Sequence, residues 1–175
     1  MKRTIFHSIA LCLLMLSPLC ADAQRWRVVQ DFHPMSKDSL SFSPDNRVGT
    51  TDFVTYTCSG PKETLFGFSN SKLISILLPK NGSTVTTTKI ADLVGLQIFH
   101  EPASGCESVK VYISLDSTAW ELVSLPDTYT YSSIDIPSIM HDSYYVKITN
   151  TANSTFSIRS ITYFMEKCNC FRYVP

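Results

Sequence analysis

The chain has 175 residues and carries 15 Lys and Arg against 15 Asp and Glu side chains, so its formal net charge is zero. This balance offers no basic surface for a nucleic-acid backbone and no polybasic patch for a membrane. Nucleic-acid binding is therefore not expected. The length that remains after an N-terminal leader is that of one ordinary domain with its own hydrophobic core.

Residues 1–23 have the layout of a secretory signal peptide. The segment begins with Lys2 and Arg3, continues with an apolar stretch, and ends in the small-residue pattern from Ala21 to Ala23. The apolar stretch is roughly half the 20 or so residues that cross a bilayer, so a permanent membrane anchor is not expected. No later stretch is long and apolar enough to span a membrane.

The mature chain, residues 24–175, is expected to be a single exported domain in the periplasm, at the outer cell envelope or outside the cell. Removal of the leader takes away Lys2, Arg3 and Asp22, which leaves 13 basic and 14 acidic side chains. Lipoprotein processing at Cys20 is an alternative. The preceding residues "SPL" argue against it, because a small residue normally stands directly before a lipidated cysteine.

The mature chain is a series of short strand-like runs separated by turn residues. The runs are rich in Val, Ile, Thr, Tyr and Phe, which suit a pleated sheet. They cover residues 25–32, 53–58, 72–78, 83–90, 94–100, 109–115, 119–125, 128–136, 144–150 and 156–165. No window of a dozen residues has the apolar periodicity of a helix. The predicted fold is all-β, a single antiparallel β-sandwich or jelly roll.

The segment "VKVYISLDSTAWELVS", residues 109–124, predicts a β-hairpin. Apolar residues fill every second position from Val109, the polar "DST" interrupts the pattern, and apolar positions resume at Trp120 and Leu122. The Trp120 ring is interpreted as a core residue rather than as a sugar-stacking one. Asp116 is interpreted as a residue that bonds the backbone of the turn, with a structural calcium ligand as the alternative.

The motif "VYISLDSTAWE", Val111–Glu121, resembles the hairpin of galactose-binding-like β-sandwiches, in which "V-Y-x-S-x-D" precedes Trp and a carboxylate. The stretches "LLPKNGSTVTTTKIADLVGLQIFHEP", "YYVKITNTANSTFSIRSITYF" and "CNCFRYVP" look similar to a β-sandwich module of secreted Bacteroidetes proteins, found alone or beside pectate-lyase-like domains. The resemblance covers roughly Phe53–Pro175. It implies a galactose-binding-like, carbohydrate-associated and non-catalytic module at the cell envelope.

Four aromatic residues are candidates for carbohydrate binding. In "TYTYSSIDI", alternation would place Tyr129 and Tyr131 on the outward face, roughly 7 Å apart, where both rings could stack under sugars. A bulge that turns both rings into the core is the alternative. In "SYYVKITN", Tyr144 is predicted to be a core residue and Tyr145 to face outward. Trp26 is the fourth candidate, or it covers the edge of the sandwich.

The four cysteines of the mature chain, Cys58, Cys106, Cys168 and Cys170, are disulfide candidates, as expected for an exported protein. Their pairing is left open, with a long-range bridge from the C-terminal pair to Cys58 or Cys106 favoured. A metal site at "CNC" is the alternative, but no His stands at a ligand-like spacing nearby. No cofactor is expected apart from the structural calcium considered above.

Enzyme activity is not expected. His100 with Glu101 and His141 with Asp142 each pair a base with an acid, but adjacent residues on a strand point to opposite faces. The hydrolase and phosphate-loop motifs are absent from the sequence. The predicted function is non-catalytic recognition of carbohydrate. The alternative is a protein-interaction or structural domain, such as an adhesin, whose partner is a cell-surface protein. A small hydrolase is the minor alternative.

Overall fold

The structure, a computed structural model, describes residues 24–32, 41–69, 72–101 and 106–167. The predicted leader, its Cys20, and the C-terminal Cys168 and Cys170 lie outside these residues. Arg25–Glu166 forms one compact unit. Within the described residues, no helix has the length and apolar character needed to cross a membrane.

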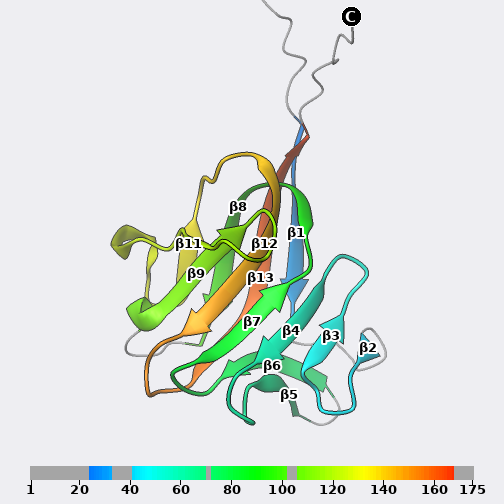
Figure 1. The fold of residues 1–175 in the computed structure, drawn as a ribbon, viewed down its shortest axis with the longest axis vertical. Helices are drawn as coiled ribbons and strands as arrows, with labels where there is room; N and C mark the ends of the chain where they lie inside the picture. Colours follow the sequence, from blue (N-terminus) through cyan, green and yellow to red (C-terminus); the bar gives the residue numbers. More distant parts are fainter. Residues whose placement is uncertain (1–23, 33–40, 70–71, 102–105, 168–175) are drawn as a thin grey trace, which may run out of the picture. The chain divides into compact units, whose positions relative to one another are not determined.

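Thirteen strands make up the fold of the described residues (Figure 1). They are β1 (Gln24–Asp31), β2 (Ser41–Phe42), β3 (Val48–Thr50), β4 (Thr55–Ser59), β5 (Leu65–Ser69), β6 (Lys72–Leu78), β7 (Ser83–Thr87), β8 (Ile90–His100), β9 (Val109–Ser114), β10 (Glu121–Leu122), β11 (Ser133–Ile136), β12 (Asp142–Asn150) and β13 (Phe156–Lys167). Two short 3-10 helices cover Cys106–Ser108 and Pro126–Thr128. The described part of the chain contains no α-helix, so the all-β prediction is confirmed.

The strands form two antiparallel layers of a sandwich of the jelly-roll type. The first layer has the order β2-β3-β4-β7-β12-β9-β10, and the second has β5-β6-β13-β8-β11, with β1 also paired to β13. Strand β12 belongs to both layers, because its first residues pair with β8 and the residues from Tyr145 onward pair with β7 and β9. In Figure 1 the first layer faces the viewer and β13, β8 and β1 lie behind it.

The core lies between the two layers and follows from the alternation of the strands. In β12, Tyr144, Val146 and Ile148 are buried, whereas Tyr145 and Lys147 lie on the opposite, partly exposed side. The outward placement of Tyr145 predicted from "SYYVKITN" is thereby confirmed. The largest fully buried side chains are Tyr56, Tyr163, Phe32, Phe66, Leu73, Ile76, Leu78, Leu93, Leu96, Ile98, Ile134 and Ile148.

Cys58 lies inside the core with only 3% of its surface exposed, and its thiol is free. The favoured bridge to Cys58 is therefore absent from the structure. Alternation along β4 places this side chain among apolar neighbours, which explains its burial. The side chain of Cys106 lies outside the described part of the chain, as do Cys168 and Cys170, so pairing among these three stays a prediction.

Two tyrosines form a polar pair in the centre of the core. The hydroxyl of Tyr163 donates to that of Tyr56 at 3.1 Å, and both side chains are fully buried. Burial raises the pKa of each phenol, because the charged phenolate would lose its hydration. Burial likewise raises the pKa of the Cys58 thiol to about 12.

We expect the free energy of unfolding to fall as the pH rises above about 9. In the unfolded chain the Cys58 thiol titrates near pH 9 and the two phenols near pH 10, whereas in the folded chain all three keep their protons well beyond those values. The unfolded state then binds fewer protons than the folded state, so stability decreases with pH. Urea unfolding curves across this range measure the slope. A stability that stays flat to about pH 11 would contradict the expectation, and Cys58→Ala should reduce the slope.

Candidate functional site

The solvent-facing side of the first layer carries an ordered row of side chains. Strand β12 lies between β7 and β9, and Lys147 pairs with Thr86 on one side and with Tyr112 on the other. Tyr112 in turn pairs with Leu122 of β10. Directly paired residues of antiparallel strands point to the same face of the sheet, so these four side chains are neighbours on one surface.

Three aromatic rings gather around Lys147 on this surface. The Lys147 Nζ atom lies 4.1 Å from the centroid of the Trp120 ring and 5.0 Å from that of Tyr112. Tyr145, two residues before Lys147 on the same strand, has the Lys89 Nζ atom 5.9 Å from its ring centroid. All three rings are partly exposed. We call Tyr112, Trp120, Tyr145 and Lys147 the aromatic face.

The placement of Trp120 corrects the core interpretation. Trp120 is only partly buried and Leu122 is 44% exposed. The reason is the register of the hairpin, which pairs Glu121 with Ile113 and so makes Glu121 the inward position of β10. The hairpin itself, β9 with β10, is confirmed. Trp120 and Leu122 do share one side, as the sequence predicted, but that side is the outer one.

Asp116 shapes the loop that delivers Trp120 to this surface. Its Oδ1 atom accepts hydrogen bonds from the backbone amides of Thr118, at 2.8 Å, and Ala119, at 3.0 Å, and from the Ser114 hydroxyl at 3.1 Å. These donors lower the pKa of Asp116, since they stabilise the charged carboxylate. The turn interpretation is confirmed. Among the described residues no cluster of three or more His, Cys, Asp or Glu side chains could hold a metal ion.

A groove of about 740 Å³ runs along the β9–β10 hairpin, next to the aromatic face. Its wall includes four strongly exposed apolar residues, Leu115, Leu122, Leu125 and Met140, which are 51%, 44%, 54% and 82% exposed. Tyr144 and Glu121 also line it. Burial, followed by the charges of Asp142 and Glu121, raises the pKa of Tyr144, so two carboxylates lie near this phenol.

The four predicted aromatic candidates do not form one site. Tyr129 packs against the core and its hydroxyl donates to the carbonyl oxygen of Val109 at 2.6 Å. Tyr131 is 77% exposed, and Trp26, on β1, is 37% exposed. Only Tyr145 belongs to the aromatic face.

The predicted shared face of Tyr129 and Tyr131 is wrong, because no strand runs through them. Strand β11 starts only at Ser133, whose amide donates to the Thr130 hydroxyl at 2.9 Å and closes a turn at this point. The two rings consequently lie in different environments. The predicted contact of Tyr129, Tyr131 and Trp26 with a carbohydrate stays a prediction. Tyr112 was missed in the sequence, although its alternation with Val111 and Ile113 indicates an outward position.

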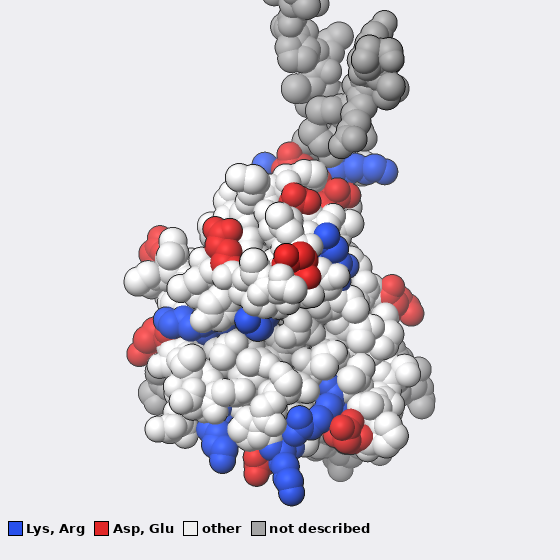
Figure 2. All heavy atoms as spheres, in the orientation of Figure 1, with Lys and Arg blue, Asp and Glu red and all other residues white. Residues whose placement is uncertain are grey.

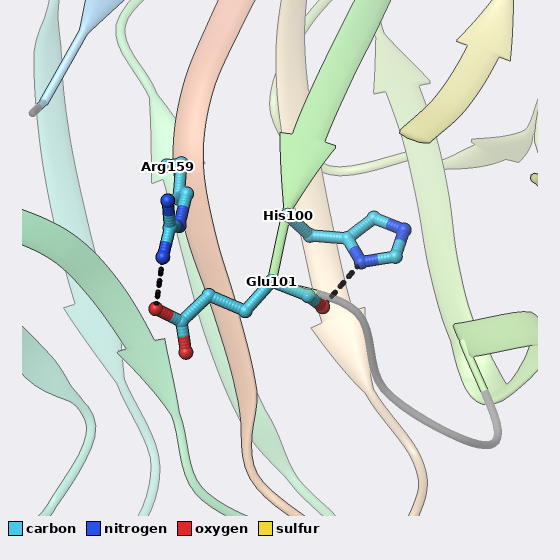
Figure 3. Close-up of polar contacts among 3 residues, drawn as sticks. All are labelled: His100, Glu101 and Arg159. Carbon is cyan, nitrogen blue, oxygen red and sulfur yellow. Dashed lines mark hydrogen bonds and ion pairs between the residues drawn. The ribbon is translucent and has the colours of Figure 1, made fainter. Parts of the chain in front are cut away.

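The side chains of His100, the last residue of β8, and Glu101, which follows it, point away from each other (Figure 3). The His100 Nδ1 atom contacts the carbonyl oxygen of Glu101 at 2.8 Å, and its ring lies 4.7 Å from that of Phe156. The Glu101 carboxylate pairs instead with Arg159 at 2.8 Å. His100 is only 3% exposed, so it has the position of a core histidine rather than that of a general base beside Glu101.

Comparisons with known proteins identify no family for this chain. No protein-family model matches the sequence, and no curated protein matches it. A solved structure similar to this chain is a family two carbohydrate esterase from Cellvibrio japonicus, with 10% sequence identity and a TM-score of 0.38. The similarity covers 82% of this chain and 34% of the esterase chain, so this chain spans about a third of that protein.

Proposed function

We propose that the protein is an exported, non-catalytic carbohydrate-binding module of galactose-binding-like type at the cell envelope, and that its sugar ligand lies on the aromatic face. The observation that carries this proposal is the gathering of Tyr112, Trp120 and Tyr145 on one solvent-facing surface of adjacent strands. A sugar ring has an apolar C–H side that stacks on an aromatic face, and tyrosine and tryptophan offer such faces at low entropic cost.

The polar surroundings of the rings suit the hydroxyl groups of a glycan. Hydroxyl side chains project beside Lys147 on the same side of the sheet, from Thr86 on β7, Thr57 on β4 and Thr149 on β12. Hydroxyls both donate and accept hydrogen bonds, as sugar hydroxyls do. Strand positions hold these groups more rigidly than loops would, which lowers the cost of ordering them on binding.

The proposal is tested by probing a glycan array with the mature domain and with Tyr145→Ala and Tyr112→Ala variants. We expect a saturable glycan signal that both substitutions weaken. Tyr131→Ala is the matched control, because it removes an exposed tyrosine away from the aromatic face and should leave binding unchanged. Loss of binding in Tyr131→Ala alone would instead favour the site predicted from the sequence. Absence of any glycan signal for the unsubstituted domain would contradict the proposed function.

The groove favours a second candidate function, recognition of a cell-surface protein. Four exposed apolar side chains, Leu115, Leu122, Leu125 and Met140, border it. Exposed apolar patches of this kind commonly mark interaction sites, and Met adapts to varied apolar partners. In this case a Met140→Ser substitution would weaken partner binding, whereas Tyr145→Ala would not. The glycan array separates the two functions, because only the first predicts a glycan signal.

A further inference from the structure

Two lysines that lie over these rings, Lys147 of the aromatic face and Lys89 beside it, form no ion pair with the described residues. Among the described residues, no carboxylate lies within ion-pair distance of the Lys147 or Lys89 ammonium, and each is instead placed over an aromatic ring. Burial lowers the pKa of Lys147, because it removes part of the hydration of the charged ammonium. A partly dehydrated cation without a counter-ion gains more from an incoming anion than a fully hydrated one does.

The outward positions of the central strands carry no acidic side chain, although Asp116 borders this surface, where its Oδ1 atom accepts a hydrogen bond from Ser114, the residue that pairs with Tyr145. The outward positions of β4, β7 and β9, and of β12 from Tyr145 onward, are Thr55, Thr57, Ser59, Thr84, Thr86, Lys110, Tyr112, Ser114, Tyr145, Lys147 and Thr149. The inward side of β10, by contrast, has Glu121, which lines the groove together with Tyr144. Figure 2 shows this side of the molecule as a largely uncharged surface over which separate Lys, Arg, Asp and Glu side chains are scattered, with some of the acidic ones in the upper middle of the view.

We propose that the ligand of the aromatic face is an acidic glycan, in which a sugar carboxylate or sulfate group binds the Lys147 ammonium while neighbouring sugar rings stack on Trp120 and Tyr112. This inference rests on the proposed function and specifies its substrate class. The Lys147 Nζ atom makes no hydrogen bond with the described residues, so its three donors are available to the anionic oxygens. Lys89, whose Nζ atom lies over the Tyr145 ring, is positioned to bind a second acidic sugar of the same glycan.

The aromatic rings make the site selective for an acidic sugar over a free anion or a neutral sugar. The Lys147 ammonium lies close to both the Trp120 and the Tyr112 ring, which limits the directions from which an anion can approach it. An acidic sugar binds the ammonium through its anionic group and stacks on the aromatic ring through its apolar C–H side. A small free anion satisfies only the charge, and a neutral sugar satisfies only the stacking surface. We therefore expect the acidic sugar to bind more tightly than either part alone.

The experiment compares two matched pairs of polymers by isothermal titration calorimetry with the mature domain. Polygalacturonate is compared with its fully methyl-esterified form, and a sulfated galactan with the same galactan after desulfation. Each pair keeps one sugar backbone and differs in whether it carries the acidic group, and the two pairs separate carboxylate from sulfate as the recognised group. We expect at least one acidic polymer to bind about 10-fold or more tightly than its neutral counterpart, as one charge-assisted hydrogen bond would provide.

The variant Lys147→Gln should remove this preference, so that the acidic and neutral forms of each polymer bind with similar affinity. Lys62→Gln is the matched control, because it makes the same change in net charge at an exposed loop residue outside the aromatic face. Added salt should weaken only the acidic polymers.

Equal affinity for charged and neutral forms, or a preference that survives Lys147→Gln, would overturn the inference while the proposed function stands. Absence of binding to all four polymers would overturn both.

Discussion

Replacing Trp120 with alanine is expected to weaken glycan binding at least about 30-fold, because an aromatic anchor at the centre of a binding surface contributes about 2 kcal/mol or more. Trp120 lies over Lys147 and beside the groove, so its loss removes the largest stacking surface of the aromatic face. Trp120→Phe keeps part of that surface and should give a smaller loss. Calorimetric titration with a bound glycan measures both effects.

The same substitution should leave the fold intact. Trp120 is partly exposed and lies outside the core, and its contact with Lys147 is a cation–π interaction worth about 1 kcal/mol near a surface. We expect the free energy of unfolding of Trp120→Ala to change by no more than about 1 kcal/mol. Unchanged glycan affinity in a folded Trp120→Ala variant would contradict the placement of the site on the aromatic face.

Replacing Asn150 with alanine is expected to destabilise the fold by about 3 kcal/mol or more. Asn150 ends β12 and is fully buried. Its Nδ2 atom donates to the carbonyl oxygens of Leu78, at 2.6 Å, and Ser154, at 2.8 Å, and its Oδ1 atom accepts from the amide of Ala152 at 2.9 Å. Alanine would remove all three bonds, and each buried group left unsatisfied costs about 1–3 kcal/mol.

The expected loss at Asn150 is measured by urea unfolding monitored by circular dichroism. Thr149→Ala is the control, because Thr149 is the preceding residue on β12 but faces outward, where substitutions usually change stability by less than about 0.5 kcal/mol. Asn150→Asp keeps the acceptor but loses both donors, so it should also be strongly destabilised. A loss below about 1 kcal/mol in Asn150→Ala would show that the Asn150 bonds do not hold the end of β12.

The sequence predicted those features that depend on alternation within one strand. Residues 144–150 alternate regularly, and the structure places Tyr144 inward and Tyr145 outward as that pattern requires. The same rule failed for Tyr129 and Tyr131, where the Thr130 side chain bonds to Ser133 and replaces the expected strand with a turn. Local side-chain bonds of this kind compete with strand pairing, and hydrophobic alternation does not reveal which of them prevails.

The aromatic face was not predicted as a unit because it depends on pairing between distant strands. Tyr112 and Lys147 are neighbours only because β9 pairs with β12 in one particular register. Trp120 joins them because the hairpin pairs Glu121 with Ile113. A shift of one residue in that register would have turned Trp120 toward the core, as the sequence interpretation assumed. Registers of this kind are set by the packing of the whole sandwich.

The fluorescence of single-tryptophan variants tests the central proposal most directly. Trp26 and Trp120 are the only tryptophans in the chain, so Trp26→Phe leaves Trp120 as the sole reporter and Trp120→Phe leaves Trp26. We predict that an acidic glycan changes the emission of Trp26→Phe saturably and leaves that of Trp120→Phe unchanged. A response confined to Trp120→Phe, or no response of Trp26→Phe to any glycan that the domain binds, would contradict a ligand site at Trp120.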